Sequence, residues 1–131
     1  MKQNYVLNTE LIKAIAGLGH TQNIVICDAG LPIPPHVKLI DLSVTKGIPK
    51  MLDVLKAVSN EMVIESFVIA SELELVNPKL VEEMQEILKD LPYKTVEHEE
   101  LKRMTEGSYA IVRTGECSSY ANILLIGGVN F

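Results

Sequence analysis

Short runs of consecutive apolar residues alternate along this chain with longer segments whose apolar residues recur at helical spacing. Residues 24–27 and 67–70 are two such runs, and residues 78–91 carry a marked helical stripe. A strand that is apolar on both faces must be covered on both faces, which is typical of parallel sheets flanked by helices. The alternation therefore predicts an α/β fold with a mostly parallel central sheet.

The predicted elements follow one another in the order α-β-β-α-β-α-β-α-β-β. Asn8 is expected to cap the first helix, and Asn77 with Pro78 to open the third. No repeat or linker divides the sequence, so we expect residues 1–131 to form a single-domain three-layer sandwich, Rossmann-like in outline. Helices are predicted over residues 9–18, 50–61, 78–91 and 99–105. Strands are predicted over residues 24–27, 37–42, 93–96, 109–113 and 122–126, and a further strand, centred on residues 67–70, within residues 63–73.

Charge and composition argue against several kinds of partner. The 12 Lys and Arg are outnumbered by 17 Asp and Glu, whereas a nucleic-acid-binding domain normally shows a basic patch. The apolar runs are far shorter than the ~20 residues of a membrane span. The first residues lack the apolar segment of a secretory signal, and Cys27 and Cys117 are isolated. We therefore expect a cytoplasmic protein with free thiols, no metal site and neither nucleic acid nor membrane as a partner.

In sheets of this kind, ligands bind beyond the carboxyl ends of the strands. The loops that follow residues 27, 70, 96 and 113 are therefore the candidate site. Asp28 directly follows a buried strand, and His98 directly follows another. His20 lies just before the first strand, and a histidine close to an aspartate suits acid–base chemistry near neutral pH.

Simpler interpretations of these residues remain open. His20 is also placed to interact with the negative end of the first helix, and Asp28 to bond the backbone of its own turn. His98 can serve as a helix cap, and His36, among prolines, is best explained as a surface residue. Neither a dinucleotide-binding nor an NTP-binding glycine motif occurs, and no G-x-S-x-G elbow occurs.

The polar segment 113–122 adds Arg113, Glu116, Tyr120 and Asn122, which together can hydrogen-bond a polyhydroxylated ligand. With this segment included, the chain resembles the family of ribose pyranases and L-fucose mutarotases. Gln22 departs from the acidic residue expected after the first motif, and His20 and Asp28 are both present. The matching stretches are LGHT (18–21), DAGLPIP (28–34), IDLS (40–43), HEELK (98–102), RTGE (113–116) and YAN (120–122).

The resemblance implies an isomerase that interconverts the β-pyranose and β-furanose rings of D-ribose in ribose uptake and catabolism. It implies His20 as the proton donor, with no cofactor and no metal. It also implies a homodecamer built from two pentameric rings, with sites near subunit contacts. The implied substrate-binding residues are Asp28, His98, Tyr120, Ala121 and Asn122. Our hypothesis is that His20 transfers the main proton while Asp28 and His98 orient the sugar and His20.

Two other functions remain open from the sequence. A non-catalytic sugar-binding or sensor module would use the same polar loops, and a mutarotase for another sugar such as L-fucose would use the same scaffold. The short loop over residues 114–121 and the HEELK stretch look closer to the ribose members. The almost wholly apolar C-terminal segment, residues 123–131, is expected to be buried in the sheet or against another chain.

Overall fold

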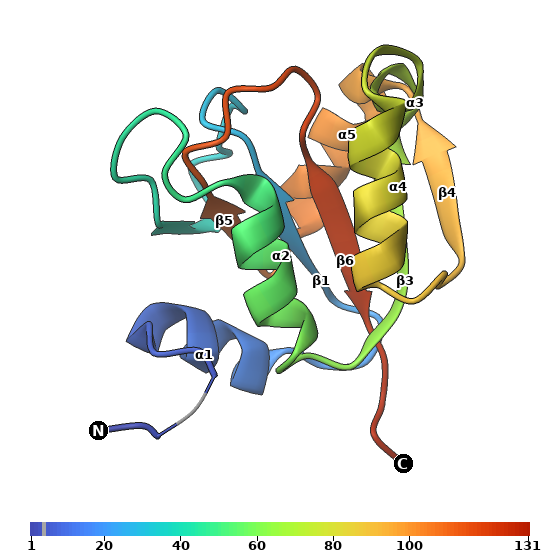
Figure 1. Ribbon diagram of the computed structural model, residues 1–131. Coiled ribbons are helices and arrows are strands. Elements are labelled where there is room, and N and C mark those ends of the chain that lie inside the picture. Colours follow the sequence, from blue (N-terminus) through green and yellow to red (C-terminus); the bar gives the residue numbers. More distant parts are fainter. Residues whose placement is uncertain (4) are drawn as a thin grey trace.

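The centre of the molecule is a six-stranded sheet, seen in a computed structural model that describes residues 1–3 and 5–131. Across the sheet the strands lie in the order β2-β5-β1-β6-β3-β4. Figure 1 shows helices on both sides of it. The strands are β1 (Asn23–Cys27), β2 (Lys38–Asp41), β3 (Ile64–Ala70), β4 (Tyr93–Val96), β5 (Ala110–Arg113) and β6 (Ile123–Gly127).

Strand β6 runs against the other five. Strands β2, β5 and β1 are mutually parallel, β3 and β4 are parallel, and β6 lies antiparallel between β1 and β3. The link from β5 to β6, residues 114–122, is too short for the crossover that a parallel connection needs. The chain therefore returns in the opposite direction, which brings the start of β6 to the same edge as the ends of β1 and β5.

Two apolar clusters cover the two faces of the sheet, which confirms the predicted α/β sandwich. The continuous apolar run of β1 divides between them: Ile24 and Ile26 join one cluster, whereas Val25 and Cys27 join the other. Successive side chains of a strand point to opposite faces, so each half of the run has its own core. Helices α1 (Thr9–Gly17), α2 (Met51–Ser59) and α4 (Pro78–Ile87) cover the first face, and α5 (His98–Met104) covers the second.

The predicted helix starts are confirmed. The Asn8 carboxamide oxygen accepts a hydrogen bond from the Leu11 backbone N–H at 2.9 Å. Asn77 does the same for Leu80 at 3.2 Å, with Pro78 in the first helical turn. Each cap satisfies a backbone donor that has no partner inside its helix.

The chain between β3 and α4 differs from the prediction. The strand predicted within residues 63–73 is present as β3, but a helix that was not predicted, α3 (Ser71–Val76), follows it directly. Glu and Leu alternate over residues 72–75, and alternation of polar and apolar residues is typical of a half-buried strand. Only Leu73 enters the core, and the Leu75 side chain is 83% exposed.

Helix α4 also ends earlier than its apolar stripe suggests. It stops at Ile87, and Lys89 and Asp90 then adopt left-handed backbone conformations. Leu91 still packs on the core from the turn that follows. The apolar stripe therefore predicted correctly which residues pack on the core, although the last of them lie beyond the end of the helix.

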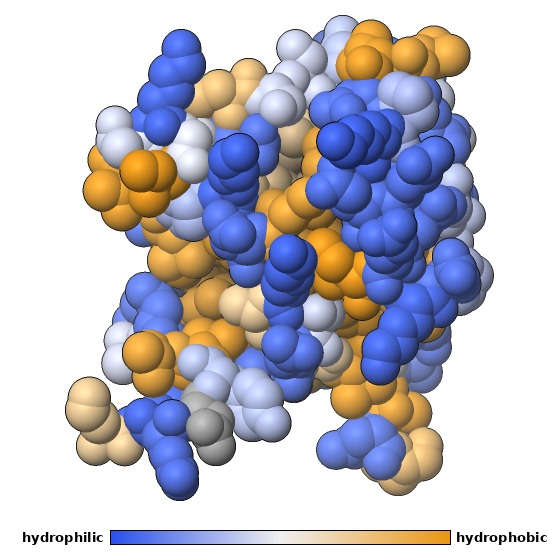
Figure 2. Space-filling model, in the orientation of Figure 1, coloured by the Kyte–Doolittle hydropathy of each residue, from blue (hydrophilic) through white to orange (hydrophobic). Residues whose placement is uncertain are grey.

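The apolar C-terminal segment divides into a buried and an exposed part. Residues 123–127 form β6 in the middle of the sheet, whereas Val129 is 40% exposed and Phe131 is fully exposed. Figure 1 shows the last residues leaving the body of the molecule, and Figure 2 shows apolar surface there and at other corners of this face. In the part of the chain that the structure describes, none of the helices combines the length and the apolarity needed to cross a bilayer.

Candidate active site

A cleft of about 440 Å³ opens at the carboxyl edge of the sheet. Three segments meet around it: the loop after β1, the first turns of α5, and the loop before β6. The lining residues are Asp28, Gly30, Leu31, Pro32, His98, Lys102, Ser119 and Tyr120. The cleft therefore lies where the strand order predicts a ligand site.

Asp28 is held in a tight network as the chain leaves β1. Its backbone N–H donates to the Asn122 carboxamide oxygen at 2.9 Å, and its Oδ1 accepts from the Gly30 N–H at 2.9 Å. The next residue, Ala29, donates its N–H to the Glu116 carbonyl at 2.8 Å. The bond to Gly30 is the turn interaction that the sequence left open, and it coexists with a position on the cleft wall.

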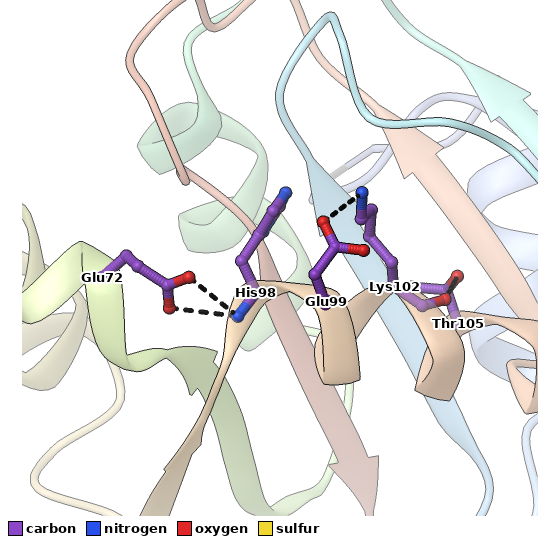
Figure 3. A network of polar contacts seen from close by, with 5 residues as sticks. All are labelled: Glu72, His98, Glu99, Lys102 and Thr105. Carbon is purple, nitrogen blue, oxygen red and sulfur yellow. Dashed lines mark hydrogen bonds and ion pairs between the residues drawn. The ribbon is translucent and has the colours of Figure 1, made fainter.

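His98 is the first residue of α5. Its backbone N–H donates to both carboxylate oxygens of Glu72, at 3.0 and 3.2 Å. The imidazole stands edge-on to the Tyr120 ring, with 5.0 Å between ring centroids. Its Nδ1 is buried and has no hydrogen-bond partner among the residues that the structure describes. Figure 3 shows the ring extending away from Glu72.

Tyr120 adopts a left-handed backbone conformation, with φ of 60°. Such a conformation costs energy for a bulky side chain and is found most often at functional sites. The Tyr120 carbonyl accepts from the Asn122 N–H at 2.8 Å, which closes the turn into β6. The turn thereby places the phenol ring against His98 at the cleft.

Ala121 and Asn122 are fully buried beneath the cleft. The Asn122 Oδ1 supports the Asp28 backbone, and its Nδ2 has no partner within residues 1–3 and 5–131. Thr114 is also buried, and its hydroxyl donates to the Cys27 carbonyl at 2.8 Å and accepts from the Glu116 N–H at 3.1 Å. A layer of buried polar groups therefore fixes the loops that carry the cleft.

The two cysteines are free, as predicted. Burial raises the pKa of the Cys27 thiol to about 12, so this side chain is a neutral core group at ordinary pH. No group of three or more His, Cys, Asp or Glu side chains suited to a metal ion occurs in the described part of the chain. Among the residues that line the cleft, Asp28, His98 and Tyr120 carry groups that can exchange protons.

His20 lies at the opposite edge of the sheet. Its Nε2 is 3.2 Å from a Glu65 carboxylate oxygen, and both side chains are about half exposed. It lines a separate hollow of about 310 Å³ together with the C-terminal residues. The five residues of β1, at ~3.3 Å each, separate His20 from Asp28 by about 16 Å or more. The sequence suggestion that these two side chains meet is therefore wrong within one chain.

The loop that carries His20 is anchored to the sheet. Thr21, in a left-handed conformation, donates its N–H to the Gly127 carbonyl at 3.0 Å. The Gln22 carboxamide oxygen accepts from the Gly19 N–H at 2.7 Å. Gln22 thus retains an acceptor oxygen at the position where an acidic residue was expected. The imidazole is presented to solvent from a fixed backbone.

Two other predicted polar residues also lie away from the cleft. Arg113 pairs with Asp41, which holds the pKa of that carboxyl far below its usual range. Glu116 accepts from the Met51 N–H at 3.1 Å. Burial raises the pKa of Glu116, but hydrogen bonds from Ser118 and Met51 lower it further than burial raises it. Both residues brace loops and do not line the cleft. His36 is exposed and bonds the Glu106 carbonyl, as expected of a surface residue.

The whole chain matches known proteins. Residues 1–130 match the model of the RbsD / FucU transport protein family. The chain belongs to this family. It is 50% identical over 131 residues to a protein named D-ribose pyranase from Geobacillus thermodenitrificans, covering 100% of this chain and 99% of the relative. It is 45% identical over 139 residues to the D-ribose pyranase of Escherichia coli O1:K1, with both chains fully covered.

Solved structures of the family have the same fold. Bacillus subtilis RbsD complexed with D-ribose matches with a TM-score of 0.95 and 39% identity, and both chains are covered completely. The fucose mutarotase of Streptococcus pneumoniae in complex with L-fucose matches with a TM-score of 0.71 and 26% identity, over 95% of each chain. This member of the family thus shares the overall fold of sugar-bound relatives.

Two residues near the cleft were missed as site candidates. Lys102 lines the cleft one turn after His98, and its ammonium is 2.8 Å from Glu99. The spacing of four residues on a helix places both side chains on one face, which was a readable signal. Glu72 carried no such signal, because it lies at the end of the segment 63–73 that was predicted to contain a strand.

Proposed function

We propose that this chain is a D-ribose pyranase, an isomerase that interconverts the β-pyranose and β-furanose forms of D-ribose. The observation that carries the proposal is the full-length match to curated proteins of that name at 45–50% identity. The RbsD structure that contains D-ribose, with its TM-score of 0.95, supports the same substrate. The cleft is a suitable size and polarity for one monosaccharide.

The reaction needs only proton transfers. A base removes the proton of the anomeric hydroxyl while an acid protonates the ring oxygen O5, and the C1–O5 bond breaks to give the open-chain aldehyde. The C4 hydroxyl then attacks C1 and loses its proton as the aldehyde oxygen gains one, which forms the furanose. Histidine and carboxylate side chains suit both directions near neutral pH. The step is redox-neutral, and all atoms are retained.

The carboxyl-edge cleft is the proposed sugar-binding site. Asp28 and the His98 imidazole orient the sugar hydroxyls, with Tyr120 against the ring of His98. Ala121 and Asn122 form the turn beneath them, and the buried Asn122 Nδ2 has no partner among the described residues. A phenol, an amide and a carboxylate supply the donors and acceptors that a neutral polyol requires.

His20 is the proposed proton donor, and it acts in the cleft of a neighbouring copy. Its distance from Asp28 within one chain, about 16 Å or more, favours this arrangement. It also agrees with the sites near subunit contacts that the family resemblance implies. The exposed position of His20 on an anchored loop suits a side chain that reaches into another subunit.

The proposed assembly is a homodecamer of two pentameric rings in the cytoplasm. Exposed apolar side chains provide surface for such contacts, since large apolar patches on a small domain usually mark interfaces. They are Leu7, Val44, Ile48, Leu75, Val76 and Phe131. A stable monomer at micromolar concentration in a sedimentation experiment would contradict this part of the proposal.

The function is tested by saturation-transfer NMR on D-ribose. We expect the protein to accelerate exchange between the pyranose and furanose signals in a dose-dependent way. Binding without faster exchange would identify a sugar-binding module and overturn the enzyme proposal. A panel that includes L-fucose decides the sugar preference: faster exchange for L-fucose than for D-ribose would replace the pyranase by a mutarotase.

A further inference from the structure

We propose that Glu72 is a positioning residue for the ribose ring exchange, because its carboxylate holds the His98 backbone and so sets where the imidazole stands in the cleft. The inference rests on the proposed function and adds a residue outside the cleft to its machinery. Glu72 does not touch the cleft surface. It acts through the two hydrogen bonds from the His98 N–H, at 3.0 and 3.2 Å.

The sheet register brings Glu72 to His98. Strands β3 and β4 are parallel neighbours, and Ala70 at the end of β3 pairs with Val96 at the end of β4. Glu72 and His98 each lie two residues beyond these partners. The two positions therefore emerge side by side at the carboxyl edge, although 26 residues separate them in the sequence.

Helix α5 depends on this contact for its first turn. The residue before it, Glu97, makes no side-chain capping bond. The first backbone N–H groups of a helix have no partner inside the helix, so an acceptor from elsewhere must satisfy them. Glu72 supplies that acceptor from α3 with a negative charge, which also suits the positive end of the helix. The start of α5 is thus fixed from outside the helix.

The Glu72 carboxylate is itself held in place. The Ser71 hydroxyl donates to its Oε1 at 3.2 Å. Its own backbone N–H, followed by that of His98, keeps the pKa of Glu72 below its usual value, so the group is ionised at working pH. Figure 3 shows the carboxylate facing the start of α5, while the imidazole of His98 extends the other way. His98 is one of the residues that line the cleft.

The experiment compares Glu72→Ala and Glu72→Gln with Glu74→Ala in the ribose exchange assay. Glu74 lies on the same helix and carries the same charge, but it accepts from the Tyr93 hydroxyl at 3.0 Å, away from the cleft. Displacing a reacting group slightly is enough to slow catalysis by an order of magnitude or more. We expect Glu72→Ala to lower exchange at saturating ribose by about ten-fold. Glu72→Gln, which keeps one acceptor oxygen, should restore most of it, and Glu74→Ala should match the wild type.

A double-mutant cycle with His98→Ala separates positioning from a structural role. If Glu72 acts through His98, substituting Glu72 in the His98→Ala background has no further effect on exchange. The same loss in both backgrounds would overturn the proposal, as would equal rates for the Glu72 and Glu74 variants. If Glu72→Ala does not fold, the backbone amide signal of His98 is compared in NMR spectra of Glu72→Gln and wild type. We expect this signal to shift, because the acceptor of the His98 N–H has lost its charge, and an unchanged signal would overturn the proposal.

The outcomes also separate this inference from the proposed function. A wild-type protein that fails to accelerate ribose exchange removes the pyranase proposal, and the role of Glu72 with it. If wild type, Glu74→Ala and Glu72→Ala all accelerate exchange at the same rate, the pyranase proposal stands and only the role of Glu72 is removed.

Discussion

At the carboxyl edge of the sheet, buried polar groups hold the candidate site, whereas at the opposite edge the candidate acid stands in the open. Asp28 and His98 are fixed by bonds to Asn122 and Glu72. Within residues 1–3 and 5–131, the His20 ring pairs with Glu65, and both side chains are about half exposed. The candidate cleft and the candidate acid thus lie at opposite edges of the sheet in one chain. This separation agrees with our proposal that each site combines residues of two copies.

The two edges should also respond differently to substitution. Groups at the carboxyl edge contribute to folding as well as to the site, because a buried polar atom that loses its partner keeps its desolvation penalty. Groups at the amino edge are exposed, where ion pairs contribute little to stability. Variants at the two edges should therefore separate activity from stability.

The largest effect is expected from His20→Ala. Loss of a general acid typically slows a proton-transfer reaction by about 10²- to 10⁴-fold, and ribose exchange measured by saturation-transfer NMR should fall by that order. Because the His20 side chain is about half exposed in the single chain, the fold of each subunit should not change, which circular dichroism checks. His36→Ala, which alters another exposed histidine, is the matched control and should keep wild-type exchange. Full exchange by a folded His20→Ala protein would show that the acid is elsewhere.

A smaller effect on activity, accompanied by a loss of stability, is expected from Asn122→Ala. Asn122 is fully buried, and the substitution removes the oxygen that accepts the hydrogen bond from the Asp28 N–H. We expect the free energy of unfolding to fall by about 1–3 kcal/mol in chemical denaturation. Asn122→Asp keeps an acceptor oxygen but puts a carboxylate at this fully buried position beside Asp28, so it should destabilise the protein at least as much. A free energy of unfolding that Asn122→Ala leaves unchanged would contradict this description of the carboxyl edge.

The smallest effect is expected from Glu65→Gln. The ion pair with His20 is about half exposed, so its loss should alter the free energy of unfolding by no more than about 0.5 kcal/mol. The same denaturation experiment provides the measurement. If Glu65→Gln lowered the free energy of unfolding as much as Asn122→Ala does, side-chain contacts at the amino edge would contribute as much to stability as those at the carboxyl edge. That result would contradict the difference between the two edges.

Most of the fold was predictable because its signals are local. The apolar run of β1 and the caps at Asn8 and Asn77 depend only on neighbouring residues. Helix α3 was not predicted, since alternating Glu and Leu carry the same period as a strand while only Leu73 is buried. Whether Leu75 faces a core depends on what packs above it, which sequence spacing does not contain.

The sequence predicted correctly which loops surround the cleft. It did not predict where His20 lies relative to the cleft. The strand-end rule correctly brought Asp28 and His98 together. His20 is eight residues from Asp28 in sequence, yet a strand lies between them and carries the chain across the sheet. The position of Asn122 beneath the cleft follows from the antiparallel direction of β6. That direction is a property of the topology, and no local pattern reports it.

The central claim, that each site combines His20 of one copy with Asp28 of another, is tested most directly by co-expressing His20→Ala and Asp28→Asn subunits. Two different tags allow mixed assemblies to be purified. Each variant alone should be at the background rate of ribose exchange. With random 1:1 mixing, about one quarter of the sites in a shared-site assembly contain both native residues. We predict about one quarter of wild-type activity in the mixed assemblies; background activity there would contradict the shared site.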